Sequence, residues 1–391
     1  MDLIKKLTGK NPDEYNLVAK NLVNNSDVQL FSKLVKQDDF LFDYIKNNVA
    51  KRIFSACNEN NYKNILNFFK YYSCSYDDMF ADVLYKYGGE SIITAIKTLF
   101  YDGDNAQKAY AIKCLLRFSN EKLYDLINKI REYTKSDFEP LAINSIELLS
   151  KLNDSESKNN ALNSLNSTDE FEQFNAIKFL VTYQAKDSID LIIEKMKKST
   201  LSENIAAEIP YLIPLEELLT INFDAGILVL CNIVNAIPEI IAPSAVIDYN
   251  LFAIIENLYF NNFSSSVAVL LRLAKEKFAQ LTENDEYLFD CDKNTKDEVF
   301  AINSFLKSVN INKINNMLYE ELYDESDFVF FAVDFVEEIN ELESLLDSTN
   351  QTLILKVLSL LKEKQLLNNA HKQNALKNIS CEHIRNIVEI L

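Results

Sequence analysis

The feature that most constrains the fold is a short pattern that recurs at a nearly constant interval. It reads Tyr110-Ala111-Ile112-Lys113, then Leu141-Ala142-Ile143-Asn144, then Asn175-Ala176-Ile177-Lys178, with 31 and 34 residues between successive alanines. Further alanines continue the series in steps of 29 to 33 residues: Ala19, Ala50, Ala81, Ala207, Ala236, Ala268, Ala301 and Ala332. A unit this short is one helix pair that cannot bury its apolar face alone, so neighbouring units must stack.

A second amphipathic pattern follows the alanine pattern within a unit. Apolar residues recur at the i, i+3, i+4, i+7 spacing of one helical face in 120–133 (Leu123, Leu126, Ile127, Ile130) and 185–198 (Ile189, Ile192, Ile193, Met196). We expect a helix over each range. A small alanine on the first helix lets the two axes approach closely.

Turn and capping residues predict where the helices begin and end. Turn signals occur at Gly88-Gly89, Asp102-Gly103-Asp104 and Asn153-Asp154-Ser155. Ser136 with Glu139, and Thr295 with Glu298, have the spacing of a capping box and predict helix starts at those residues.

Composition favours an all-α fold, because 5 glycines and 6 prolines are few for a chain of 391 residues. We predict a right-handed α-solenoid of about eleven or twelve antiparallel helix pairs with a concave face. The abundant Asn and the excess of Lys over Arg are typical of an AT-rich genome.

The Ala-Ile-Lys or Ala-Ile-Asn pattern, the apolar second helix and the period together resemble HEAT-type repeats, in the short form common in bacterial proteins. The resemblance is clearest over 100–200 and 296–340. It implies an armadillo-like helical scaffold for protein binding and names no activity. The Pro, Asp and Arg that often stand near HEAT turns are mostly missing.

The regularity of the repeat pattern divides the chain into regular repeats over 1–200, an irregular acidic section over 201–295, and further repeats with a C-terminal cap over 296–391. The irregular section contains Pro210, Pro214, Pro238 and Pro243, each predicted to end or kink a helix. In the cap we expect a helix over 351–364 and one or two more over 366–391.

Charge is uneven along the chain, whose formal net charge is −18. Residues 201–300 carry 5 basic and 16 acidic residues, and no Lys or Arg occurs between Lys198 and Arg272. Such a chain repels phosphate backbones, which argues against nucleic acid and anionic membranes as main partners. The apolar run Gly226–Ile247 is interrupted by Asn and Pro and lacks basic flanks, so we expect buried helices there instead of a membrane span.

The search for chemistry finds no phosphate-binding loop and no nucleophile elbow, so we expect no enzymatic activity and no cofactor. His371, Cys381 and His383 are too sparse for a zinc site, and Cys381 is expected to start a helix. Asp290-x-Asp292-x-Asn294 begins like a calcium loop but lacks its later ligands, so 285–298 is expected to be an acidic loop. Six cysteines without a close pair fit a reducing, cytoplasmic location.

These observations favour a non-enzymatic scaffold that binds a basic partner protein through its acidic section. The carboxylates expected to contact the partner are Glu203, Glu208, Glu216, Glu217, Asp224, Glu239, Asp248, Glu256, Asp285, Asp290 and Asp292. Two alternatives stay open. Some proteins with similar repeats attach or remove bilin chromophores, which makes an enzyme or lyase-type chaperone one of them. The other is a nucleic-acid-binding solenoid that uses the cluster Lys195, Lys197 and Lys198.

Overall fold

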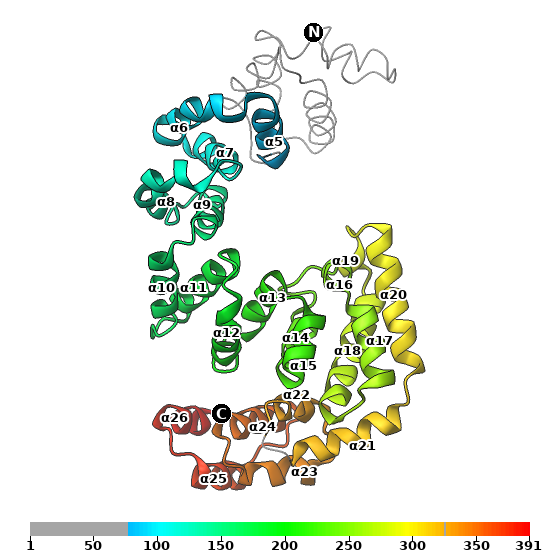
Figure 1. Cartoon of the computed structure of the whole chain (residues 1–391). Helices are drawn as coiled ribbons and strands as arrows, with labels where there is room; N and C mark the ends of the chain where they lie inside the picture. The colour runs from blue at the N-terminus through cyan, green and yellow to red at the C-terminus, as the bar shows by residue number, and fades with distance from the viewer. Residues whose placement is uncertain (1–76, 324–325) are drawn as a thin grey trace, which may run out of the picture. The chain divides into compact units, whose positions relative to one another are not determined.

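A computed structural model describes residues 77–323 and 326–391, and every regular element in those ranges is a helix (Figure 1). The all-α prediction is therefore confirmed for this part of the chain. The residues form two compact units, which we describe separately: 77–166 with 182–184, and 167–181 with 185–391. The repeat anchors Ala19 and Ala50 lie outside the described residues.

In the first unit, the described residues form six α-helices joined by turns and short 3-10 helices. They are α5 (Asp77–Gly88), α6 (Ile93–Asp102), α7 (Asn105–Leu115), α8 (Ile127–Tyr133), α9 (Glu139–Lys151) and α10 (Ser155–Ser164).

Helix α7 is the centre of the first unit and packs against α5, α6 and α9. Its anchor Ala111 is fully buried, as the predicted role of the repeated alanine requires. Polar side chains of α9 then bond to carbonyls of α7 or just beyond its end. The Asn144 Nδ2 donates to the Ala109 carbonyl at 3.0 Å, and the Lys151 Nζ donates to the Leu116 carbonyl at 2.7 Å.

The second amphipathic patterns correctly predict the buried faces but not the continuity of the helices. Residues 120–133 form two 3-10 turns, Asn120–Lys122 and Tyr124–Leu126, before α8 begins. Their apolar residues Leu123, Leu126 and Ile130 are nevertheless buried. In 185–198 the helix α12 (Ile189–Met196) likewise follows a 3-10 turn, and it buries Ile192, Ile193 and Met196.

The turn signals are confirmed, whereas both predicted capping boxes are wrong. Asp104 caps α7, and Asp154 caps α10 directly after Asn153, whose φ is 54°. The Ser136 hydroxyl instead accepts from the Phe138 backbone N–H, and α9 begins at Glu139. Helix α20 starts at Lys293, before Thr295, because the Asp292 carboxylate accepts from the Thr295 N–H at 2.7 Å.

The second unit contains the remaining helices. They are α11 (Glu170–Thr182, whose last residue belongs to the first unit), α12, α13 (Ser202–Leu212), α14 (Leu215–Ile221), α15 (Phe223–Ala236), α16 (Ala245–Asp248), α17 (Leu251–Asn261), α18 (Ser265–Glu283), α19 (Asp285–Leu288), α20 (Lys293–Ser308), α21 (Ile311–Leu322), α22 (Val329–Ala332), α23 (Ile339–Ser344), α24 (Gln351–Glu363), α25 (Asn369–Asn378) and α26 (Glu382–Ile390).

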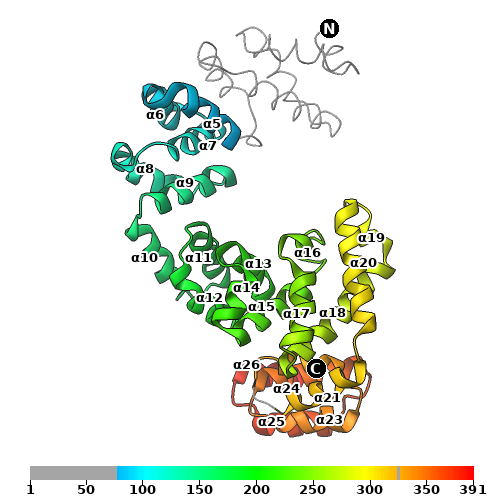
Figure 2. The ribbon, with the colours of Figure 1, turned by 45° about the vertical axis from the view of Figure 1, so that its right-hand side comes forward.

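Helices α15 and α18 form the core of the second unit and lie side by side (Figures 1 and 2). Helix α15 also packs against α13 and α14, and α18 against α20 and α21. Nearly every residue of α15 is buried, as expected for the apolar run 226–247. Along the described part of the chain, no helix combines the length and apolar character needed to cross a bilayer.

The prolines act at or near helix boundaries. Pro210 lies inside α13, which ends two residues later at Leu212, and Pro214 is the N-cap of α14. Pro238 follows α15 after a cis peptide bond, and Pro243 precedes α16. The irregular section therefore consists of helices of very uneven length, from the 4 residues of α16 and α19 to the 19 residues of α18.

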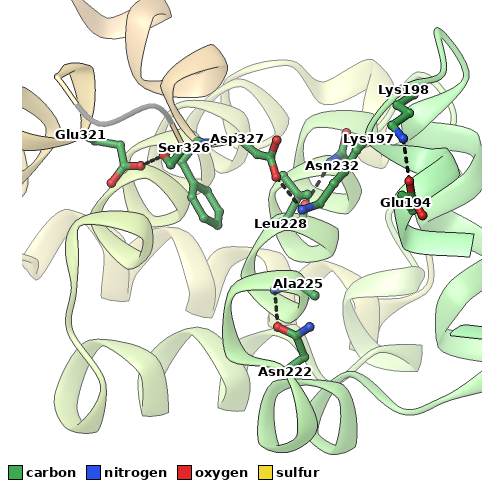
Figure 3. Close-up of polar contacts among 11 residues, drawn as sticks. Glu194, Lys197, Lys198, Asn222, Ala225, Leu228, Asn232, Glu321, Ser326 and Asp327 are labelled. Atoms are coloured by element: carbon green, nitrogen blue, oxygen red, sulfur yellow. Dashed lines mark hydrogen bonds and ion pairs between the residues drawn. The ribbon is translucent and has the colours of Figure 1, made fainter. Parts of the chain in front are cut away.

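An ion pair joins the C-terminal part of the second unit to the beginning of the same unit. Lys197, directly after α12, forms an ion pair with Asp327, two residues before α22, at 2.6 Å (Figure 3). Helix α22 packs against α18 and α24. The helix predicted over 351–364 is α24, and α25 and α26 are the two further helices expected after it. Cys381 is the N-cap of α26, so the predicted helix start is confirmed.

Candidate functional site

The acidic section contains a pocket of about 520 Å³ between α14 and α17 of the second unit. Its polar wall comes from both helices and the residues next to them: Glu216, Thr220, Asn250, Asn257 and Asn262. Its apolar wall consists of Leu219, Phe223, Ala253, Ile254 and Leu258. A concave site with an apolar lining and a few polar groups is the usual form of a ligand site.

Glu216 and Asn250 join the two sides of this pocket. The Asn250 Nδ2 donates to the Glu216 Oε1 at 2.9 Å, and both residues are exposed. Asn250 is the N-cap residue of α17 in the left-handed conformation, with φ 54° and ψ 38°, and its side chain makes no capping bond. Asn tolerates this backbone region better than most residues. Its amide is therefore used to hold the carboxylate in place.

The apolar wall is set by a close approach of α14 to α15. A Cβ atom at Gly226 of α15 would lie 3.0 Å from the Cα and 2.7 Å from the Cδ2 of Leu219 on α14. Glycine is required there, because the neighbouring backbone leaves no room for a side chain. On the other side of the pocket, Ile254 and Leu258 of α17 are almost fully buried.

Most of the other predicted partner-binding carboxylates of this section lie on the surface outside the pocket. Exposed are Glu217, Asp224, Glu239, Asp248 and Glu256, whereas Glu203 and Glu208 are half-buried. Three of them face polar or basic groups: Glu217 lies 3.8 Å from the Lys186 Nζ, Glu239 lies 3.7 Å from the Lys277 Nζ, and Glu203 accepts from Asn235. The structure thus places one predicted carboxylate, Glu216, in the pocket.

The prediction of an acidic loop over 285–298 is wrong. Asp285 begins α19 and Lys293 begins α20, so four residues, 289–292, lie between the two helices. Asp290 is exposed in this short connection. The hydrogen bond from the Thr295 N–H to the Asp292 carboxylate lowers the pKa of Asp292, which acts as a helix cap.

The opposite side of α17 carries a cluster of aromatic rings. Phe305 of α20 lies at 6.0, 5.8 and 6.0 Å between ring centroids from Phe252, Tyr259 and Phe260. The Lys313 Nζ sits 3.9 Å from the ring centroid of Phe263. These ring contacts join α17 to α20 on this side, in contrast to the open pocket between α14 and α17.

Three of the residues considered for metal or nucleic-acid binding, His371, Lys197 and Lys198, have structural partners. The His371 ring contacts Asn368, the N-cap of α25, and its Nε2 lies 2.9 Å from the Glu343 Oε1. Within the described ranges, no three His, Cys, Asp or Glu side chains gather closely enough to hold a metal ion. In the predicted lysine cluster, Lys197 pairs with Asp327 and Lys198 with Glu194 (Figure 3).

Sequence reasoning missed the amide side chains of the pocket. The abundant Asn was interpreted as a property of the genome, which hid a signal in α17. Asn250, Asn257 and Asn261 are spaced by seven and four residues, so they share one helical face. The Asn261 Nδ2 donates to the Asn257 Oδ1 at 2.5 Å. An amide row on one helix next to a carboxylate on another was the available indication of a binding surface.

Comparison with known proteins does not identify the chain. No family model matches it, and no curated protein is similar to it in sequence. Its function must therefore be argued from the pocket and the surface around it.

Proposed function

We propose that this chain is a non-enzymatic α-solenoid scaffold, built on HEAT-like repeats, that binds a basic segment of a partner protein through residues 203–256 of its acidic section. The repeat architecture is supported by hydrogen bonds between residues about one unit apart. Tyr133 to Phe100, Asn144 to Ala109 and Lys275 to Leu306 are separated by 33, 35 and 31 residues. Side chains of one helical repeat thus bond to carbonyls of the adjacent repeat, as expected for stacked repeats.

The observation that carries the binding proposal is a pocket with a carboxylate in a stretch that has no cation of its own. No Lys or Arg occurs from residue 199 to residue 271. In the described part of the chain, no Lys or Arg side chain pairs with Glu216. An exposed surface of one sign attracts partners of the opposite sign and raises their rate of association.

A fluorescently labelled basic peptide tests the proposal by anisotropy with the full chain. We expect its dissociation constant to rise at least about tenfold between about 50 and about 300 mM NaCl, because salt screens exposed charges. The double variant Asp224→Lys/Asp248→Lys should bind at least about fivefold more weakly at low salt.

The matched control reverses two exposed carboxylates of the first unit, Glu121→Lys/Asp137→Lys. It changes the net charge equally and should retain most of the binding. Equal losses in both double variants would contradict the proposed location. Affinity that does not depend on salt would contradict the electrostatic basis.

A further inference from the structure

We infer that the pocket between α14 and α17 is an anchor for a single lysine side chain of the bound segment, in preference to arginine. This inference rests on the proposed function and adds the residue that the pocket recognises. Three features of the pocket support it: its shape, the hydrogen bonding of the Glu216 carboxylate and the neutral oxygens around that carboxylate.

The pocket matches a side chain with an apolar stem and a charged head. Its volume of about 520 Å³ is within the range of small-ligand sites. Leu219, Phe223 and Ala253 are the more exposed apolar residues of the lining and offer surface to the methylene stem. Long basic side chains bury their stems on such surface while the charged group stays near water. The Phe223 ring in the same lining attracts a cation further.

The Glu216 carboxylate has one oxygen in use and one available. Its Oε1 accepts from the Asn250 Nδ2 at 2.9 Å. Arginine derives its usual advantage from two parallel bonds to both carboxylate oxygens. At Glu216 the Asn250 amide already takes one of the two lone pairs of Oε1 and crowds the second of these parallel bonds, so a guanidinium loses part of its advantage there.

An ammonium group suits the remaining acceptors better. It is a compact charge with three donors that can point in different directions. The Oε2 of Glu216, the Thr220 hydroxyl and the Asn257 Oδ1, which also accepts from Asn261, are acceptors in the same lining. The Thr220 hydroxyl donates to the Glu216 carbonyl at 2.9 Å, which leaves its lone pairs for an incoming donor.

The test uses three labelled peptides that are identical except for a central Lys, Arg or norleucine, each with the same two basic flanking residues. Anisotropy with the full chain at low salt should give the tightest binding for Lys. We expect Arg to bind about threefold and norleucine about tenfold more weakly. Glu216→Gln should weaken the Lys peptide about fivefold to tenfold and reduce its difference from norleucine.

Glu217→Gln is the matched control, because it removes the same charge from the next residue of α14, outside the pocket lining. It should leave the order of the three peptides unchanged. Unchanged thermal unfolding of both variants separates loss of binding from loss of structure.

The possible failures distinguish the two proposals. If none of the peptides binds the unmodified chain at low salt, both the proposed function and the lysine anchor are wrong. If all three bind with equal affinity, or Arg binds as tightly as Lys, the anchor is wrong and the acidic docking surface stands. Spermidine that displaces the Lys peptide at concentrations near the dissociation constant of that peptide would instead identify a free polyamine as the ligand.

Discussion

Replacing Asp154 by Ala should increase local unfolding of α8–α10 far more than the same change at another helix cap of the first unit increases unfolding around that cap. Asp154 is 7% exposed and has two functions. Its carboxylate caps α10 by accepting from the Ser157 N–H at 3.3 Å. It also accepts from the Arg131 Nε at 2.9 Å and from the Arg131 Nη2.

The magnitude follows from these two contributions. Loss of a cap costs about 1 kcal/mol. Breaking a buried ion pair costs about 3–5 kcal/mol when the remaining charge has no partner. Arg131 is 27% exposed and also contacts the Glu156 carboxylate at 2.6 Å, so much of that cost is recovered. We therefore expect a total of about 2 kcal/mol, which corresponds to about 30-fold faster hydrogen exchange.

The assay is hydrogen exchange followed by mass spectrometry on peptides that span α8–α10, which assigns the effect to the first unit. Asp104→Ala is the control, since Asp104 caps α7 with an exposed carboxylate and should cost about 1 kcal/mol in its own region. Asp154→Asn retains a capping side chain and removes the charge. Equal acceleration by Asp154→Ala and Asp104→Ala would refute a net contribution from Arg131.

The pH dependence gives a second check on the same residue. Burial alone raises the pKa of the Asp154 carboxyl, but the hydrogen bonds from Arg131 and Ser157 outweigh burial and lower that pKa. A lowered pKa in the folded state means that the ionised group stabilises the fold above its unfolded pKa. This stabilisation is lost as the pH falls through the folded pKa. The difference in stability between the unmodified chain and Asp154→Asn should therefore have its largest value above about pH 5 and shrink below about pH 4.

Two further predictions concern the repeat and the pocket. Ala111→Leu should destabilise the first unit by about 1–3 kcal/mol, measured by the same exchange experiment, because this fully buried alanine lies on the helix at the centre of the unit. Asn250→Gly should change stability by less than about 0.5 kcal/mol, since glycine suits the left-handed position. It should nevertheless weaken the Lys peptide, because Glu216 loses its hydrogen bond. Unaltered stability in the first variant or unaltered binding in the second would contradict these explanations.

Periodicity predicted the helical class and the buried faces because burial repeats with the helix. Leu123, Leu126 and Ile130 are buried although the residues before α8 form 3-10 turns, so the apolar pattern survives a change of helix type. Cap positions were less predictable. Thr295 and Asp292 are both good capping residues three positions apart, and the carboxylate at Asp292 determined the start of α20.

The pocket was less predictable because it depends on contacts between helices distant in sequence. On charge alone, the sequence placed Glu216 in a group of eleven acidic residues and did not distinguish it from the other ten. What distinguishes it is its place in the pocket lining, where Asn250, 34 residues away in sequence, bonds to it. Likewise, the position of Leu219 depends on Gly226 of the next helix. The density of acidic residues in the sequence indicates a charged surface. Whether that surface contains a pocket depends on packing between helices that are distant in sequence.

The opening between α14 and α17 follows from the side chains that face it. On the other side of α17, the rings of Phe252, Tyr259 and Phe260 meet Phe305 and occupy the space before α20. Toward α14, the same helix presents Ala253 and the short polar Asn257. Side chains of that size are too short to fill the space between α14 and α17. A polar side chain such as Asn257 also favours an open surface, where water can satisfy its hydrogen-bonding groups. One helix thus closes the surface on one side and leaves it open on the other, at the place where Glu216 is free of basic neighbours in the described chain.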